Sequence, residues 1–123
     1  MSRKQELNTE SIFFYEANRK KIISSLKKQF NLKLNDILFI YHLKNTNSRR
    51  IPLHKIKQSI NFSLMEIHKS LTTLTERKII GKERSTEDER KVFITITDAQ
   101  AKEIDEILEG FDEIQRSTLN SND

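Results

Sequence analysis

Basic side chains flank a polar stretch of the chain at residues 85–90. Arg84 precedes the stretch, and Arg90 and Lys91 close it. Guanidinium and ammonium groups on a narrow projecting loop can enter a groove of double-stranded DNA and pair with its phosphates. Asp88 lies two residues before Arg90, so its carboxylate could accept a bidentate hydrogen bond from the guanidinium and hold it extended. These residue types predict contact with a polyanion; a solvated hairpin with ordinary surface charges is the alternative.

The segments on either side of this stretch predict a β-hairpin. Residues 92–97 alternate between two faces, with Val92, Ile94 and Ile96 on one and Phe93, Thr95 and Thr97 on the other, which is the pattern of a half-buried strand. Residues 80–84 can pair with them as a second strand. The charged tip is longer than the two-residue turn that a simple hairpin needs. We therefore predict that residues 79–97 form the wing of a winged helix and that Lys82 joins its DNA-binding cations.

Two short helices are predicted before the hairpin, and together they form a helix-turn-helix over residues 53–77. The first covers about residues 53–59. The second opens at a capping-box pattern of Ser63 and Glu66, with Glu66 on its outer face. Its expected inner face consists of Leu64, Ile67, Leu71 and Leu74. The residues expected to contact DNA from these two helices are Lys55, Lys57, Ser63, His68, Lys69, Thr72 and Thr73. A solvated helix face is the alternative.

Long helices are predicted at both ends of the chain. The first starts from a cap at Thr9 or Ser11, and the last starts from a cap at Thr97. An apolar stripe on a terminal helix often packs against a partner, so we expect residues 1–30 and 98–118 to form a dimer interface. Packing within the core of one chain is the alternative. The expected interface residues are Ile12, Tyr15, Ile104, Ile107, Leu108, Phe111 and Ile114.

The middle of the chain completes the expected fold. Residues 35–45 are apolar nearly all round and predict a central, buried helix. Residues 49–52 can add a third short strand. We expect one domain over residues 1–119 and a disordered tail at 120–123. The predicted fold is therefore mainly α with a small β-hairpin (α+β), a winged helix-turn-helix with five main helices.

Charge is distributed unevenly along the 123 residues, although the net charge is only +4. Residues 1–96 contain 20 lysines and arginines against 10 acidic residues, whereas residues 97–123 contain 2 against 8. The basic part suits a polyanion such as DNA. The acidic end would be repelled by the same partner, so we expect it to face away.

Several classes of protein are disfavoured by what the chain contains. There is no cysteine, and the three histidines fall on three different predicted helices without metal-ligand spacing. The paired acids lie on an exposed tip that offers acid–base chemistry no shelter. We therefore expect no enzyme activity, no metal and no cofactor. No apolar run is long enough to span a membrane, so a cytoplasmic location is expected.

The wing sequence resembles a known group of regulators. Asp88-Glu89-Arg90, followed by five residues and then Ile96-Thr97, fits the wing signature of MarR-type winged-helix regulators. The run Lys82-Glu83-Arg84-Ser85-x3-Asp88-Glu89-Arg90-x-Val92 is similar to the staphylococcal accessory regulator A (SarA) family. The resemblance implies a homodimer, built from the terminal helices, that binds AT-rich promoter DNA. It also implies a recognition helix in the major groove and a wing in the minor groove. In that wing Arg84 and Arg90 would bind DNA, supported by Asp88 and Glu89.

Two other functions stay open at this point. A winged helix can instead serve as a protein-interaction module that dimerises with other regulator proteins and does not bind DNA. RNA binding is less favoured, because the chain lacks the exposed aromatic pairs that stack unpaired bases.

Overall fold

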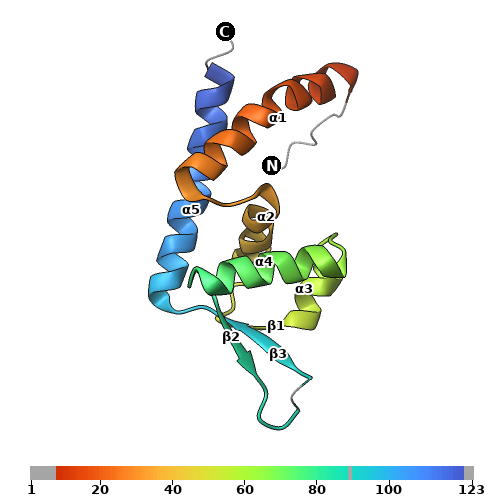
Figure 1. The fold of residues 1–123 in the computed structure, drawn as a ribbon, viewed down its shortest axis with the longest axis vertical. Coiled ribbons are helices and arrows are strands. Elements are labelled where there is room, and N and C mark those ends of the chain that lie inside the picture. The colour runs from red at the N-terminus through yellow and green to blue at the C-terminus, as the bar shows by residue number, and fades with distance from the viewer. Residues whose placement is uncertain (1–7, 89, 121–123) are drawn as a thin grey trace.

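The computed structural model describes residues 8–88 and 90–120, which contain five helices and three strands. In chain order the elements are α1 (Thr9–Phe30), α2 (Leu34–Asn45), β1 (Arg50–Pro52), α3 (Leu53–Ser59), α4 (Leu64–Glu76), β2 (Gly81–Arg84), β3 (Val92–Thr95) and α5 (Asp98–Asn120). The helix-turn-helix and the hairpin share one end of the molecule, while the start of α1 and the end of α5 lie at the other (Figure 1). The predicted α+β winged-helix fold is confirmed.

Helix α2 is the centre of the core, as predicted. Phe39, Ile40 and Leu43 are fully buried in it, and the helix packs against α3, α4 and α5. The prediction that it is buried all round is wrong on one face. Leu38 is 39% exposed and Tyr41 51% exposed. Both line the groove between α2 and α5, which no other element among residues 8–88 and 90–120 fills.

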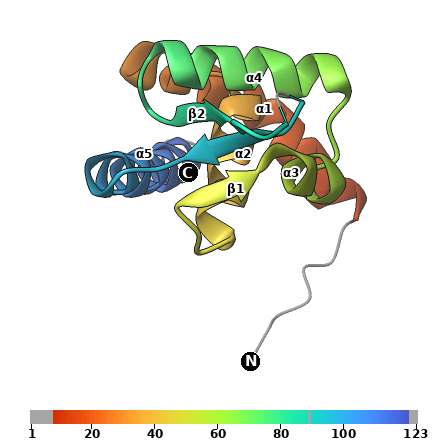
Figure 2. The same cartoon turned by 90° about the horizontal axis from the view of Figure 1, so that it is seen from below.

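The three strands form one antiparallel sheet in the order β1-β3-β2. The predicted third strand at residues 49–52 is thus confirmed as β1. Ile51 pairs with Ile94 across β1 and β3, and both side chains are buried. Alternation along a strand turns the next residue outward, so Phe93 lies on the opposite face of the sheet. Figure 2 shows the sheet below α4, with α3 on one side and α5 on the other.

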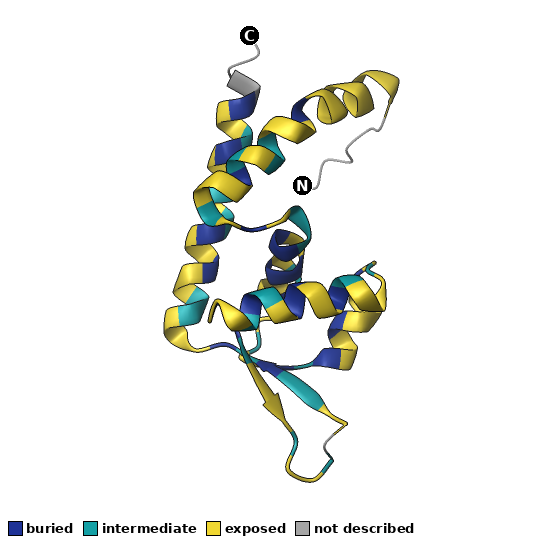
Figure 3. Ribbon diagram, viewed as in Figure 1, coloured by how far each residue is buried: buried dark blue, intermediate teal, exposed yellow. Residues whose placement is uncertain are grey.

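Helices α1 and α5 pack against each other at one end of the molecule. Leu26 and Asn18 are the buried residues of α1, whereas its first turns project away from the body and are exposed (Figures 1 and 3). The predicted caps at Thr9 or Ser11 are wrong. Asn8 caps α1, since its side-chain oxygen accepts a hydrogen bond of 2.8 Å from the Ser11 backbone N–H.

The last helix is longer than predicted. Helix α5 continues to Asn120, so the predicted tail begins at least one residue later than expected; residues 121–123 lie outside the described residues. Its predicted Thr97 cap is confirmed, because the Gln100 N–H donates to the Thr97 hydroxyl over 3.1 Å. Within the described residues, no helix is both long and apolar enough to cross a lipid bilayer.

Gly110 allows α1 and α5 to approach closely. A Cβ atom at this position would lie 2.3 Å from Cζ of Phe30. We expect Gly110→Ala to lower the free energy of unfolding by about 1–2 kcal/mol, because displacing the ring costs more than the helix propensity gained. Urea denaturation would measure this loss. Adding Phe30→Leu should recover part of it; equal losses with and without Phe30→Leu would contradict the proposed clash.

Candidate nucleic-acid interface

The exposed face of α4 forms a continuous stripe along the helix. Ile67, Leu71 and Leu74 are buried as predicted, which turns the opposite side of the helix outward. Leu64 is wrong as an inner-face residue, because it is 61% exposed in the first turn. Of the predicted DNA-contacting residues on this helix and its cap, only Thr73 is half-buried. The exposed residues of the stripe are Met65, His68, Lys69, Thr72 and Glu76, and exposed Leu64 lies beside it in the first turn.

The start of α4 is fixed by the predicted capping box. The Ser63 hydroxyl accepts the Glu66 N–H over 3.1 Å, and the Glu66 carboxylate accepts the Ser63 N–H over 2.8 Å. Glu66 also accepts a 3.2 Å hydrogen bond from the side chain of Asn35 at the start of α2. The predicted outer-face position of Glu66 is therefore wrong: the residue is half-buried and its carboxylate is directed at α2.

These hydrogen bonds alter the titration of Glu66. The backbone N–H of Ser63, then its side chain and that of Asn35, lower the pKa of the Glu66 carboxyl. A pKa that is lower in the folded chain means that the carboxylate stabilises the fold above its ordinary pKa. This contribution is lost as the pH falls through the lowered value.

Two matched cap substitutions separate stability from binding. Ser63→Ala and Thr97→Ala should each lower the free energy of unfolding by about 1 kcal/mol, because each leaves a helix N–H unpaired. Thermal denaturation would measure both. Only Ser63→Ala should also weaken DNA binding if Ser63 contacts bases, as predicted. Equal affinities for the two variants would assign Ser63 a capping role alone.

The wing is a hairpin whose tip is organised by its own polar groups. The Ser85 hydroxyl accepts the backbone N–H groups of Glu87 and Asp88, at 3.2 and 3.3 Å. The Lys91 N–H donates to the Asp88 carbonyl, and the Ser85 N–H donates to the Lys91 carbonyl, each over 2.9 Å. The tip is therefore a hydrogen-bonded turn.

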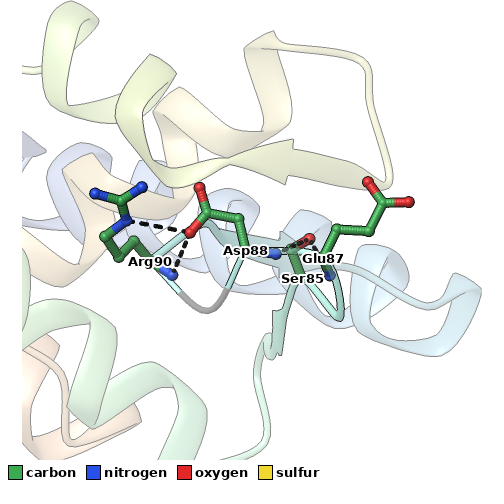
Figure 4. A network of polar contacts seen from close by, with 4 residues as sticks. All are labelled: Ser85, Glu87, Asp88 and Arg90. Atoms are coloured by element: carbon green, nitrogen blue, oxygen red, sulfur yellow. Dashed lines mark hydrogen bonds and ion pairs between the residues drawn. The ribbon is translucent and has the colours of Figure 1, made fainter.

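Asp88 supports Arg90 as predicted, but with a different geometry. One carboxylate oxygen, Oδ1, accepts both the Arg90 backbone N–H at 3.0 Å and the guanidinium Nε–H at 3.2 Å (Figure 4). The expected bidentate contact to the guanidinium is wrong. Only one residue separates Asp88 from Arg90, and the carboxylate oxygen that accepts the guanidinium Nε–H also accepts the Arg90 backbone N–H. The Arg90 side chain is 92% exposed, so its two terminal nitrogens point outward. Glu89, the second predicted supporting residue, lies outside the described residues.

Seven of the exposed cations lie on the helix-turn-helix and the wing. On the helices they are Lys55, Lys57 and Lys69, and on the wing they are Lys82, Arg84, Arg90 and Lys91. All seven were predicted from the sequence, and all lie at the end of the molecule that carries the helix-turn-helix and the wing. The acidic helix α5 runs from the base of the sheet away from the wing tip (Figure 1). DNA contact by these residues stays a prediction.

One basic residue near the wing was missed. The Arg50 guanidinium carbon lies 3.6 Å from the centre of the Phe93 ring, and its Nη2 lies 3.6 Å from the Glu83 carboxylate. This stacking holds the Arg50 side chain, which comes from β1, on the outer face of the sheet. One pattern in the sequence could have pointed to Arg50: the alternation along β3, which directs its partner Phe93 outward.

The predicted dimer residues fall into two groups. Ile104, Ile107 and Ile114 are buried within this single chain, so packing of α5 on its own core accounts for their spacing. Ile12 and Tyr15 are 50% and 49% exposed on the projecting part of α1. The remaining two, Leu108 and Phe111, are half-buried and line a groove of about 470 Å³ together with Ile37, Leu38 and Tyr41.

The histidines lie apart, as their spacing indicated: His42 is on α2, His54 on α3 and His68 on α4. Among residues 8–88 and 90–120, no three His, Asp or Glu side chains gather as they would around a metal ion.

Solved structures share this fold. The MepR–DNA complex of Staphylococcus aureus matches with a TM-score of 0.67 and 16% identity, over 94% of this chain and 85% of MepR. Sco3205, a MarR family regulator from Streptomyces coelicolor in complex with DNA, matches with a TM-score of 0.67 and 12% identity, over 98% and 80%. A MarR transcription factor from Planctomyces limnophilus gives a TM-score of 0.68 at 18% identity, over 97% and 88%.

Sequence comparison identifies the family. SarR of Staphylococcus aureus is 31% identical over 94 residues, which cover 76% of this chain and 82% of SarR. SarU of the same organism is 28% identical over 112 residues; the match covers 85% of this chain but 43% of SarU, so the chain spans less than half of that relative. The family model for the transcriptional regulators SarA and Rot matches residues 21–107. The chain therefore belongs to the SarA/Rot family of transcriptional regulators.

Proposed function

We propose that this chain regulates transcription as a homodimer that binds AT-rich double-stranded promoter DNA. The observation that carries the proposal is the end of the molecule where seven exposed cations lie on the helix-turn-helix and the wing, together with the exposed face of α4. Family membership supports a regulatory role, and MepR and Sco3205, which share the fold, were solved in complex with DNA.

Helix α4 enters the major groove in this proposal. Its width of about 12 Å admits one α-helix, and polar side chains there can read base edges. His68, Lys69 and Thr72 occupy the exposed stripe and provide donors and acceptors for this contact. Lys55 and Lys57 on the preceding helix bind phosphates and fix the register of the helix on the duplex.

The wing enters the neighbouring minor groove. Arg90 projects from a turn that Asp88 and Ser85 hold by hydrogen bonds. AT-rich DNA has a narrow minor groove whose negative potential attracts arginine, so the wing reads shape more than base identity. Arg84 joins it from β2, and Lys82 and Lys91 contact the flanking phosphates.

The homodimer forms through the terminal helices. Four consecutive large apolar residues, Ile12 to Tyr15, are between 49% and 69% exposed on α1. A monomer gains nothing from holding them in water, whereas a second copy can bury them. The groove lined by Leu38, Tyr41, Leu108 and Phe111 is an apolar surface of suitable size for such side chains. A dimer would present two helix-turn-helices to successive major grooves.

A titration of the full chain into labelled duplexes tests this function. Fluorescence anisotropy should give tight binding to an AT-rich duplex and weaker binding to a GC-rich duplex of equal length. Equal affinity for both would contradict the AT-rich preference. The absence of binding to either by a folded dimer would contradict DNA binding and favour the second candidate, an interaction module for other regulator proteins, which the exposed apolar residues of α1 would also suit.

A further inference from the structure

Two large apolar side chains are exposed at the first two positions of α4. Leu64 is 61% exposed and Met65 is 67% exposed. Neither belongs to the buried core. Met65 lies on the side of the helix away from Ile67, and Leu64 lies beside the buried face in the first turn, which extends beyond the core. Their exposure leaves apolar area in water that a bound partner could cover.

The surroundings of this pair restrict what that partner is. Met65 continues directly into His68, Lys69 and Thr72 along one exposed stripe, and Leu64 lies beside this stripe in the first turn. The one carboxylate in the first turn, Glu66, is held by the Ser63 N–H and the Asn35 amide and is directed toward α2. The exposed neighbours of the pair along the helix are therefore hydrogen-bonding or cationic side chains, and the nearest carboxylate is turned away, which suits a polyanion with an apolar group at its recognised edge.

Double-stranded DNA has one such group in its major groove, the C5-methyl group of thymine. In a helix-turn-helix, the residues at the start of the recognition helix contact base edges. We propose that Leu64 and Met65 contact thymine C5-methyl groups in the major groove and make the protein select for thymine at these positions. This inference rests on the proposed DNA-binding function.

The contact gives the protein a second source of preference for AT-rich DNA. The wing responds to the width of the minor groove, where thymine presents only its O2 acceptor. The apolar pair responds to the methyl group in the opposite groove. The two sources can be separated, because replacing thymine by deoxyuridine removes the methyl group and keeps the minor-groove edge unchanged.

The experiment measures anisotropy of the full chain with an AT-rich duplex and with the same duplex containing deoxyuridine for thymine. Removing the methyl groups should weaken wild-type binding about fourfold for each contacted methyl, the factor expected for one buried apolar carbon. The variant Leu64→Ala/Met65→Ala should bind the thymine duplex more weakly and the two duplexes equally. Both side chains are exposed, and alanine favours helix, so the variant should fold; circular dichroism checks this.

Lys69→Ala is the matched control on the same stripe. It should weaken binding to both duplexes and keep the preference for thymine. Equal wild-type affinity for the thymine and deoxyuridine duplexes would overturn the inference and leave DNA binding intact. A thymine preference that persists in Leu64→Ala/Met65→Ala would also overturn it, because other residues would then detect the methyl group. The absence of binding to either duplex would overturn the proposed function as well.

Discussion

Replacing Arg90 by alanine should weaken binding to an AT-rich duplex about 100-fold, because each of two wings in a dimer would lose about tenfold in affinity. The Arg90 side chain is 92% exposed, and its only described contacts are to Asp88 in the same turn. Its loss should therefore change the free energy of unfolding by about 0.5 kcal/mol or less. Fluorescence anisotropy and thermal denaturation would measure the two effects separately.

Arg116→Ala is the matched control for charge. Arg116 lies on α5 and pairs with Glu113 at 2.8 Å, away from the wing. Its replacement removes the same charge and should leave DNA affinity within about twofold, because distant exposed charges are screened at physiological salt. Full affinity in Arg90→Ala would remove the wing from the mechanism. An equal loss in both variants would mean that only net charge matters.

A carboxylate at Phe13 should separate the dimer into monomers and weaken DNA binding at least about 100-fold, because a monomer loses the gain from two linked binding sites. Phe13 is 69% exposed on the projecting part of α1, so Phe13→Asp should leave the fold of one chain intact. At a dimer interface the same change would bury an unpaired charge. Analytical ultracentrifugation would give the oligomeric state and anisotropy the affinity.

Asn47→Asp is the control for this added charge. Asn47 lies in the exposed turn between α2 and β1 with φ 54°, a conformation that aspartate also tolerates. It should remain a dimer with unchanged affinity. If Phe13→Asp and Phe14→Asp both remain dimers, the projecting part of α1 is not the interface. If the monomer binds DNA as tightly as the wild type, dimerisation is not needed for binding.

Features set by neighbouring residues could be predicted from the sequence. The capping boxes at Ser63 and Thr97 depend on partners three positions away, and both are present. The alternation of residues 92–97 correctly predicted β3 and its pairing. The start of α1 was misplaced by a few residues because Asn8, Thr9 and Ser11 are all good capping residues, and helix ends depend on small differences between them.

Features set by tertiary packing could not be predicted in this way. Helical spacing placed Leu64 on the inner face of α4, but the first turn of the helix extends beyond the core. Glu66 is turned from that helix's outer face by Asn35, 31 positions earlier in the chain. The apolar stripe of α5 is present as predicted, but the spacing of its residues does not show whether the same chain or a second copy buries them. Ile104, Ile107 and Ile114 on this stripe are buried by their own chain.

The cations of the candidate interface were found from the sequence because long charged side chains remain exposed in most folds. That they lie together at one end of the molecule could be seen only from the fold. Arg50 was missed because its partners, Phe93 and Glu83, come from two other strands.

The salt dependence of binding to an AT-rich duplex tests the central proposal most directly. Each phosphate contact should contribute about 0.9 to the slope of log Kd against log salt concentration. A dimer that uses lysines and arginines from both helix-turn-helices and both wings should therefore give a slope of about 5 or more. A folded dimer that shows no binding at low salt, or an affinity that does not change with salt, would contradict the proposal that this surface binds DNA.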